Sequence, residues 1–270
     1  AALKAGKHVY TEKPLAMTFE QGRELVSLAK EKGLQIGCAP DTFLGGRLQN
    51  IRELIDSGRL GRITGGGAWF VGHGHEFHHP APAFFYQPGA GPLYDMGPYY
   101  VTALLSLLGP VKRVCAMATK AGETRTVPSG PSKGQVLPVD VDTHINAILE
   151  FVCGAQVTLT CSFDVWDSEL PRMEIYGTEG TVLIDEKDPI SGPNLFGGDT
   201  LMRTPDQYRW ADAERSGERK RAVAGRAEQP SVQFGQPRRE PARHRTGRSR
   251  VCAPRGPHAA GLRRDGAAFA

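Results

Sequence analysis

An alternation of extended and helical patterns in the first 40 residues constrains the fold more than any other feature of this sequence. Residues 7–11 form a short extended run, Thr18 followed by Gln21 is a capping-box signature, and residues 34–38 predict a second buried strand. Strands that alternate with helices in this way form parallel sheets in α/β domains. Two short strands and one helix are too few to close such a sheet, so we expect further elements of this domain to precede residue 1.

The pattern changes after residue 41, where short strands begin to dominate. We expect a helix over residues 46–56 that stops at Gly58, and a strand that starts at Ile63. Pro98 suits the first residue of an apolar helix that runs through Leu107 to Gly109. Alternation with a period of two predicts five further strands, near residues 111–118, 143–152, 156–163, 172–176 and 181–184. The sequence therefore predicts an α/β segment followed by an α+β domain whose sheet is antiparallel.

Charge divides the chain into a mildly acidic body and a basic tail. Residues 213–270 hold 14 of the 33 Lys and Arg residues but only 5 of the 29 Asp and Glu residues, and they lack apolar periodicity. We therefore expect this tail to be disordered. Its arginines could bind phosphates, but Phe234 and Phe269 are its only aromatics for base stacking, so we expect no nucleic-acid partner. The Arg, Ala, Pro and Gly bias also fits a GC-rich gene read out of frame.

Localisation signals and cysteine usage both indicate a cytoplasmic protein. No run of about 18 apolar residues suggests a membrane span, and residues 1–7 lack the apolar stretch of a secretory signal. We expect no membrane partner. An odd number of scattered cysteines without CxxC spacing argues against a disulfide framework and predicts reduced core thiols. These cysteines are Cys38, Cys115, Cys153, Cys161 and Cys252.

Two short motifs carry the side chains best suited to chemistry. Glu12-Lys13-Pro14 follows the first strand, and the carboxyl ends of strands are where open α/β sheets place their ligands. Asp95 and Tyr99 lie four residues apart at a helix start, a spacing that puts them on one face. Each motif also has an ordinary structural interpretation. The first could be a surface turn, and the second a helix cap followed by a packing aromatic.

A long loop over residues 72–91 separates these motifs and is rich in Gly, Pro, His and aromatic residues. Loops of this length inside a compact body are commonly functional. We predict that His78, His79, Phe84 and Tyr86 shape a substrate pocket, although half of them could serve only as loop anchors. The four imidazoles and one carboxylate of residues 73–79 could instead chelate a divalent metal in a hydrolase or isomerase. Their spacing matches no established ligand pattern, so we expect no metal.

The order of these elements resembles the Gfo/Idh/MocA oxidoreductases over about residues 1–210. The resemblance rests on Glu12-Lys13-Pro14-Leu15-Ala16 after the first strand, Cys38-Ala39-Pro40-Asp41 after the second, and the Gly-rich helix start at Asp95-Met96-Gly97. It implies a partial Rossmann domain over residues 1–41 and a substrate and oligomerisation domain with a largely antiparallel open sheet over residues 42–211, followed by the tail, residues 212–270. It also implies hydride transfer between NAD or NADP and a sugar, polyol or related alcohol, in a homo-oligomer formed through the open sheet.

The same resemblance implies roles for individual residues. Lys13 corresponds to the family lysine between the nicotinamide and the reacting hydroxyl, and Asp95 begins the family's Asp-x-x-x-His pattern. Tyr99 replaces the histidine of that pattern. We expect Tyr99 to donate or accept the proton, with Lys13 as its cationic partner and Asp95 as the residue that orients the substrate. We expect Glu12, Lys13 and Pro14 to contact the cofactor, and the Lys13–Pro14 peptide bond to be cis.

Two departures from the family pattern leave alternatives open. No G-x-G-x-x-G turn follows a strand, although that turn holds the cofactor's pyrophosphate, so we expect this chain to bind NAD(P) poorly. The family's terminal helix, with its Gly-Glu-x-Ala-x-His-like pattern, is replaced by the basic tail. A catalytically silent interaction subunit that pairs through its open sheet is therefore an alternative to an active oxidoreductase. The family also contains nicotinamide-dependent glycosidases, so net redox chemistry does not follow from the resemblance alone.

Overall fold

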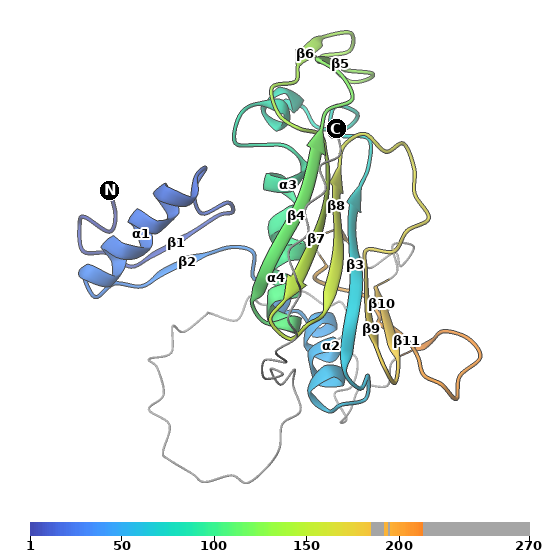
Figure 1. Cartoon of the computed structure of the whole chain (residues 1–270). Coiled ribbons are helices and arrows are strands. Elements are labelled where there is room, and N and C mark those ends of the chain that lie inside the picture. Colours follow the sequence, from blue (N-terminus) through green and yellow to red (C-terminus); the bar gives the residue numbers. More distant parts are fainter. Residues whose placement is uncertain (185–191, 194, 213–270) are drawn as a thin grey trace, which may run out of the picture.

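The computed structural model describes residues 1–184, 192–193 and 195–212 of the 270-residue chain. The described elements form a small β-α-β unit at the N-terminus and a larger body built on one sheet (Figure 1). The tail predicted to be disordered lies outside the described residues except for Asp212, as does Cys252. None of the helices in these described ranges is long and apolar enough to cross a membrane.

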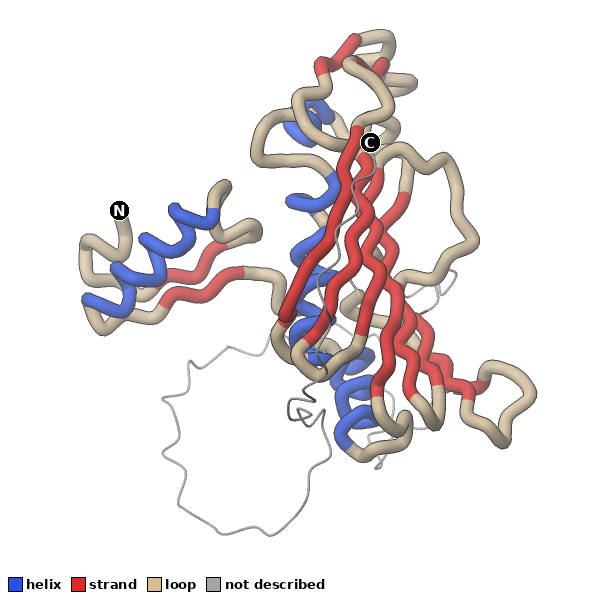
Figure 2. The backbone as a smooth tube through the Cα atoms, viewed as in Figure 1, coloured by secondary structure: helices blue, strands red, loops and turns tan. Residues whose placement is uncertain are grey.

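The N-terminal unit has the two parallel strands and one helix that its sequence pattern predicts. β1 (Val9–Thr11) pairs with β2 (Ile36–Cys38), and α1 (Phe19–Glu31) connects them. The capping box is present, because the Thr18 hydroxyl accepts a hydrogen bond from the Gln21 amide and the Gln21 side chain accepts one from the Thr18 amide. These strands form a sheet of their own, apart from the large sheet (Figure 2).

The larger body is organised around an eight-stranded sheet with the order β12-β11-β10-β9-β3-β8-β7-β4. Neighbouring strands are antiparallel except for β3 and β8, which run parallel. The predicted largely antiparallel open sheet is therefore confirmed. Its strands are β3 (Ile63–Val71), β4 (Val111–Thr119), β7 (His144–Phe151), β8 (Gln156–Ser162), β9 (Met173–Gly177), β10 (Thr181–Ile184), β11 (Leu201–Arg203) and β12 (Ala211–Asp212).

Helices cover one face of this sheet, and the core lies between the two layers (Figure 1). The predicted helix over residues 46–56 is confirmed, whereas the helix predicted to begin at Pro98 begins one residue earlier, at Gly97, and ends at Leu108. The helices of this layer are η1 (Thr42–Leu44), α2 (Gly46–Asp56), η2 (Pro82–Tyr86), α3 (Pro92–Asp95) and α4 (Gly97–Leu108). Fully buried side chains from both layers meet in the core, among them Leu48, Ile51, Leu104, Leu107, Phe151, Met173 and Ile175. Their removal from water is the main stabilising contribution to this arrangement.

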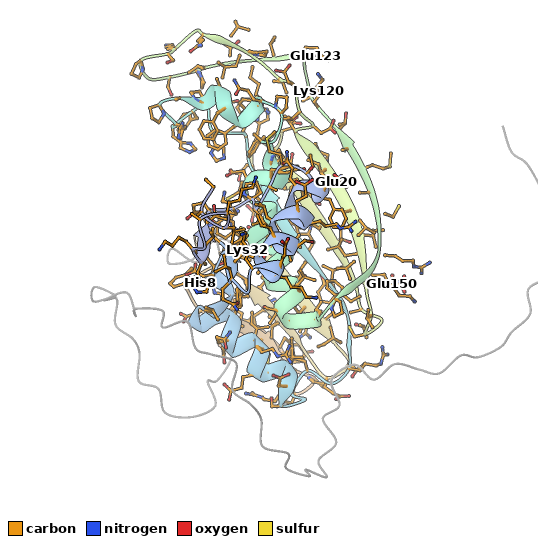
Figure 3. All side chains as sticks on the ribbon, turned by 90° about the vertical axis from the view of Figure 1, so that its left-hand side faces the viewer. His8, Glu20, Lys32, Lys120, Glu123 and Glu150 are labelled. Atoms are coloured by element: carbon orange, nitrogen blue, oxygen red, sulfur yellow. The ribbon has the colours of Figure 1, made fainter. Side chains whose placement is uncertain are left out.

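The opposite face of the sheet is open over β4 and β7. Met117 on β4 is 81% exposed and Ile148 on β7 is 54% exposed. Glu150, also on β7, lies on this outer side, away from the helices (Figure 3). Cys115 on β4 is exposed as well, so the prediction that the cysteines are core thiols is wrong for this residue, because the edge strand β4 is not covered by another layer. The described cysteines are all free thiols, and only Cys161 among them is fully buried.

An arm over residues 120–143 connects β4 to β7 and carries a small hairpin. Its strands are β5 (Thr124–Thr126) and β6 (Val136–Pro138), which pair with each other at one end of the body (Figure 1). The arm contacts the long loop after β3. The Asp140 amide donates to the Tyr86 carbonyl over 2.9 Å, and the Ser129 hydroxyl donates to the Phe77 carbonyl over 2.6 Å. The arm therefore braces residues 72–79, which we call the histidine loop.

Candidate active site

Lys13 and Asp95 meet where the N-terminal unit touches the larger body. Lys13 follows β1, and its Nζ lies 2.9 Å from Oδ1 of Asp95. The same ammonium group also donates to the main-chain oxygen of Asp95. Both side chains are largely buried, with exposed fractions of 16% and 18%. An ion pair between residues 82 positions apart in the chain thus joins the two segments that the sequence analysis treats as separate.

The Asp95 carboxylate has a second partner that the sequence analysis did not assign to it. His75, in the histidine loop, places Nε2 3.0 Å from Oδ2 of Asp95. Burial raises the pKa of Asp95, but hydrogen bonds from His75 and Lys13 and the charge of Lys13 outweigh that effect, so the pKa lies below its ordinary value of 3.8. Asp95 is therefore ionised at neutral pH, and each of its carboxylate oxygens has a fixed donor.

A tight turn positions Asp95 for these contacts. Gly91 begins α3 with φ of +87° and ψ of 170°, a backbone conformation that essentially only glycine adopts. A Cβ atom at this position would also lie 3.1 Å from the main-chain oxygen of Asp142. α3 then ends at Asp95, and α4 starts two residues later. The single helix start predicted around Asp95 and Tyr99 is thus interrupted. Asp95 is the last residue of the short helix α3, and Tyr99 lies in the separate helix α4.

Tyr99 lies in the first turn of α4 and faces Lys13. The Nζ of Lys13 lies 5.3 Å from the centroid of the Tyr99 ring, within the range of a cation–π contact. Tyr99 is partly exposed. The structure therefore brings together the three residues predicted to be catalytic, with Lys13 between Asp95 and Tyr99.

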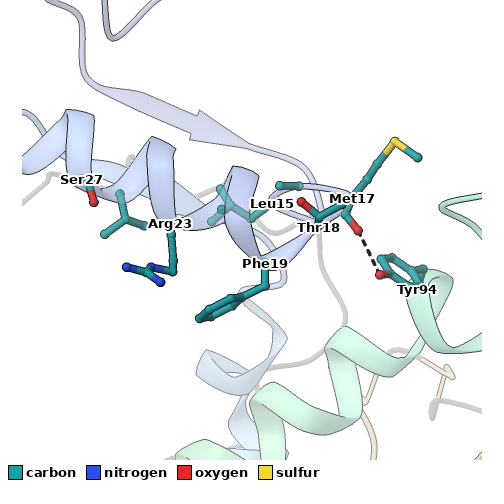
Figure 4. A pocket seen from close by; sticks show the side chains of 10 residues that line it. Leu15, Met17, Thr18, Phe19, Arg23, Ser27 and Tyr94 are labelled. Atoms are coloured by element: carbon teal, nitrogen blue, oxygen red, sulfur yellow. Dashed lines mark hydrogen bonds between the residues drawn. The ribbon is translucent and has the colours of Figure 1, made fainter.

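The remaining predicted cofactor residues flank Lys13. Glu12 and Pro14 are both exposed, and the Lys13–Pro14 peptide bond is cis, as expected. A groove lies beside them, lined by residues 15–19 and by α1 of the N-terminal unit (Figure 4). Tyr94 closes one side of this groove, and its hydroxyl donates to the main-chain oxygen of Met17 over 3.0 Å. This contact is a second link between the N-terminal unit and α3.

The predicted substrate residues of the long loop fall into two groups. His78 is exposed, and its Nε2 lies 3.3 Å from Nδ1 of His75. His79 is partly exposed, and its ring packs edge-on against Phe84 and Phe85, with centroids 5.3 Å and 5.1 Å away. His78 is therefore linked to Asp95 through His75, whereas the ring of His79 packs on the neighbouring aromatic side chains. Tyr86 does not reach that surface, because its side chain is fully buried.

Tyr86 belongs instead to a buried polar network beneath the histidine loop. Its hydroxyl donates to Glu76, and Glu76 also forms an ion pair with Arg125 of β5. Arg125 forms a second ion pair with Asp164, which accepts a further hydrogen bond from Thr143. Burial raises the pKa of Glu76, but hydrogen bonds from Tyr86 and Arg125 outweigh it and keep that pKa below 4.5. This network holds Glu76 of the histidine loop in the interior, whereas His75 and His78 of the same loop remain at least partly exposed.

The other imidazoles of the histidine loop point to different partners. His73 stacks on Trp166 with a centroid distance of 3.4 Å, whereas His75 contacts Asp95. Within the described ranges, no group of three or more His, Cys, Asp or Glu side chains is arranged to hold a metal ion.

Family models match both segments that meet at this site. Residues 48–183 match the GFO/IDH/MocA C-terminal domain, and residues 1–39 match the oxidoreductase family with an NAD-binding Rossmann fold. The chain belongs to the Gfo/Idh/MocA family. The resemblance that Lys13 and Asp95 suggested is thereby confirmed, and residues 1–39 are part of a Rossmann fold whose family binds NAD.

Relatives of this family member include sugar dehydrogenases. A D-xylose dehydrogenase of Paenarthrobacter nicotinovorans is 29% identical over 194 residues, which are 67% of this chain and 49% of that protein. An NAD binding oxidoreductase from Klebsiella pneumoniae has a similar fold, with a TM-score of 0.64 at 23% identity over 78% of this chain and 55% of that one. A levoglucosan dehydrogenase in complex with NADH and L-sorbose gives a TM-score of 0.61 at 22% identity, with coverage of 78% and 55%. The chain spans about half the length of the curated relatives that it matches.

Proposed function

We propose that this chain forms the substrate half of a nicotinamide-dependent oxidoreductase that acts on a sugar, polyol or related alcohol. The observation that carries the proposal is the cluster in which Lys13 contacts both Asp95 and the ring of Tyr99. The sugar substrates of the relatives support the substrate class. We retain the division into residues 1–41, 42–211 and 212–270 as part of this proposal.

The residues that border the cofactor's reactive end fit a nicotinamide. Lys13 follows the carboxyl end of β1, the position where open α/β sheets place their ligands, and its ammonium is held by Asp95 rather than free in solvent. NAD or NADP, when bound, supplies the hydride acceptor for oxidation or the hydride donor for reduction. In this proposal Lys13 contacts the cofactor's reactive end and the reacting hydroxyl, and Glu12 and Pro14 border the cofactor.

Tyr99 is the proposed group for proton transfer. For alcohol oxidation, Tyr99 as the phenolate would accept the proton of the reacting hydroxyl, and the carbon that carries this hydroxyl would give up its hydride to the bound NAD or NADP. The alcohol would thereby become a carbonyl compound, and the proton on Tyr99 would pass to solvent. The Lys13 ammonium stabilises negative charge on the phenolate and on the reacting oxygen. Asp95 fixes Lys13 and orients the substrate, and His78 and His79 border the substrate on the loop side.

The decisive experiment for this function is a titration with NADH and NADPH, followed by nicotinamide fluorescence and then by turnover of a panel of pentoses, anhydrosugars and polyols. We would compare this chain with the gene's full reading frame, extended upstream if a Gly-rich segment is encoded there. We expect nucleotide binding by the form that carries that segment, and loss of turnover in Lys13→Met and Tyr99→Phe with binding retained. If neither form binds either nucleotide, the oxidoreductase proposal is wrong and the interaction subunit gains support.

We also propose that the chain self-associates through the open face over β4 and β7. Met117 and Ile148 are large apolar side chains exposed on that face, and a shallow hollow there is lined by residues 115–119, His144, residues 146–148 and Thr158. Exposed apolar patches of this kind mark interaction sites. The mass of the protein in solution tests the proposal: Met117→Glu should reduce the mass to that of one chain. Thr158→Glu adds the same charge on β8 in the same hollow, so it should also weaken the self-association. An unchanged mass in both variants would contradict it.

A further inference from the structure

The geometry of the histidine loop points to a further residue of the site, and we propose that His75 is a positioning residue that orients the Asp95 carboxylate toward Lys13. The inference rests on the proposed function for its effect on turnover, but the contact itself stands on the structure alone. His75 and Lys13 contact different oxygens of the Asp95 carboxylate, with Nε2 of His75 3.0 Å from Oδ2 and Nζ of Lys13 2.9 Å from Oδ1. The carboxylate is therefore held at both oxygens.

The chemistry of the carboxylate determines the tautomer of His75. Asp95 is ionised at neutral pH, and an ionised carboxylate can only accept hydrogen bonds. The hydrogen of this contact must therefore be on Nε2 of His75. Nδ1, the other ring nitrogen, lies 3.3 Å from Nε2 of His78. The arrangement thus requires the Nε2–H form of His75.

His75 is held rigidly enough to act in this way. Its ring packs on Phe85 with a centroid distance of 4.0 Å and meets Phe163 nearly edge-on at 5.0 Å. The next residue, Glu76, is only 5% exposed and is fixed by Arg125 and Tyr86. A side chain between two aromatic rings, on a loop anchored by an ion pair, loses little further freedom when it binds Asp95.

The position of Asp95 matters because Lys13 depends on it. Lys13 donates to Oδ1 and to the main-chain oxygen of the same residue, so a rotation of the carboxylate removes one of its two contacts. If Asp95 lost its bond to His75, Oδ1 would be free to turn away from Nζ, and Lys13 would no longer be fixed beside Tyr99. A misplacement of about 1 Å in such a site can cost about 100-fold in rate.

The test compares His75→Leu, which removes the donor, with His75→Gln, whose amide nitrogen can replace Nε2. We expect His75→Leu to lower kcat/KM for the sugar by on the order of 100-fold, and His75→Gln to recover most of that loss. His8→Leu and His8→Gln are matched controls, because His8 is exposed and accepts a hydrogen bond from the Gln35 amide within the N-terminal unit. Equal losses in His75→Gln and His75→Leu would overturn positioning in favour of an imidazole that itself transfers the proton. No loss in either would also overturn it.

A spectroscopic measurement tests the contact independently of turnover. Two-bond ¹⁵N–¹H correlations of the imidazole rings at neutral pH should show His75 as the Nε2–H tautomer, and Asp95→Asn should change its ring-nitrogen shifts, whereas those of His8 should not change. An Nδ1–H tautomer, or shifts insensitive to Asp95→Asn, would overturn the inference. If the protein oxidises no sugar but these shifts behave as expected, the proposed function fails and the contact between His75 and Asp95 stands.

Discussion

Arg125 is the residue whose replacement tests the architecture of the loop most directly. Its side chain is 11% exposed and forms ion pairs with Glu76 and Asp164, which are 5% and 12% exposed. In Arg125→Met the aliphatic part is kept, but two buried carboxylates lose their cation. Breaking a buried ion pair by removing one partner typically costs about 3–5 kcal/mol. Because both pairs share one cation, we expect a single cost of about this size.

Such a loss is a large part of the total stability, which is about 5–15 kcal/mol for a typical domain. In a domain of 150–250 residues, each kcal/mol lost lowers Tm by about 2–4 °C, so a loss of about 3–5 kcal/mol should lower Tm by roughly 6–20 °C. Chemical unfolding followed by circular dichroism would measure the free energy of unfolding, and a thermal melt would measure Tm. The matched control is Arg113→Met, which removes an Arg from an exposed pair with Glu150 and should change stability far less.

The charge argument also predicts how this difference changes with pH. The pKa of Glu76 is below 4.5 in the wild-type fold because hydrogen bonds, including one from Arg125, outweigh its burial. In Arg125→Met the carboxylates take up protons more readily, so the gap in stability between variant and wild type should narrow as the pH falls to about 4 and below. Adding Glu76→Gln to the variant should recover part of the loss at neutral pH. A gap that is the same at pH 7 and pH 4, or no larger than that of Arg113→Met, would refute the electrostatic reasoning.

Three further predictions follow from the core, the turn before Asp95 and the acid groups of the site. Leu104→Ala, at a fully buried position of α4, should lower the free energy of unfolding by about 2–5 kcal/mol in a denaturant titration, whereas Leu105→Ala, on an exposed part of the same helix, should cost much less. Gly91→Ala should cost about 1–3 kcal/mol because of its φ of +87°, and it should lower turnover if it displaces Asp95. Wild-type stability contributed by Glu76 and Asp95 should be fully present above pH 4.5 and lost as the pH falls through their lowered pKa values, which urea midpoints between pH 7 and pH 2.5 would measure.

Local patterns in the sequence were sufficient to predict most elements of the fold. The capping box at Thr18, the glycine stop at Gly58 and the alternation in the strands depend on neighbours within a few residues, so each can be recognised without knowledge of the rest of the chain. The parallel pairing of β3 with β8 could not be predicted in this way. It joins strands about 90 residues apart, and a period of two has the same appearance in parallel and antiparallel strands.

Burial and partners at the site depended on contacts that have no local signal. Tyr86 lies in a loop rich in pocket-forming residues, yet its hydroxyl donates to Glu76 and its ring lies against Arg125 in the interior. Cys115 has the apolar neighbours of a core residue, but its strand is the edge of the sheet and has no layer over it. In both cases the neighbouring residues indicate what kind of environment the side chain would suit, whereas its actual burial is determined by segments that are distant in the sequence.

The contact between His75 and Asp95 shows what a sequence can and cannot reveal about this site. Lys13 and Asp95 were found because each lies in a short motif that a known family shares. His75 lies among four histidines within seven residues, and such density suggests a metal site before it suggests individual roles. Only the fold separates them: His73 stacks on Trp166, His79 packs on Phe84 and Phe85, and His75 alone turns toward Asp95. Lys13 occupies only one side-chain oxygen of Asp95, and a carboxylate this buried requires a hydrogen-bond donor for the other. A nearby histidine is therefore a candidate for that donor.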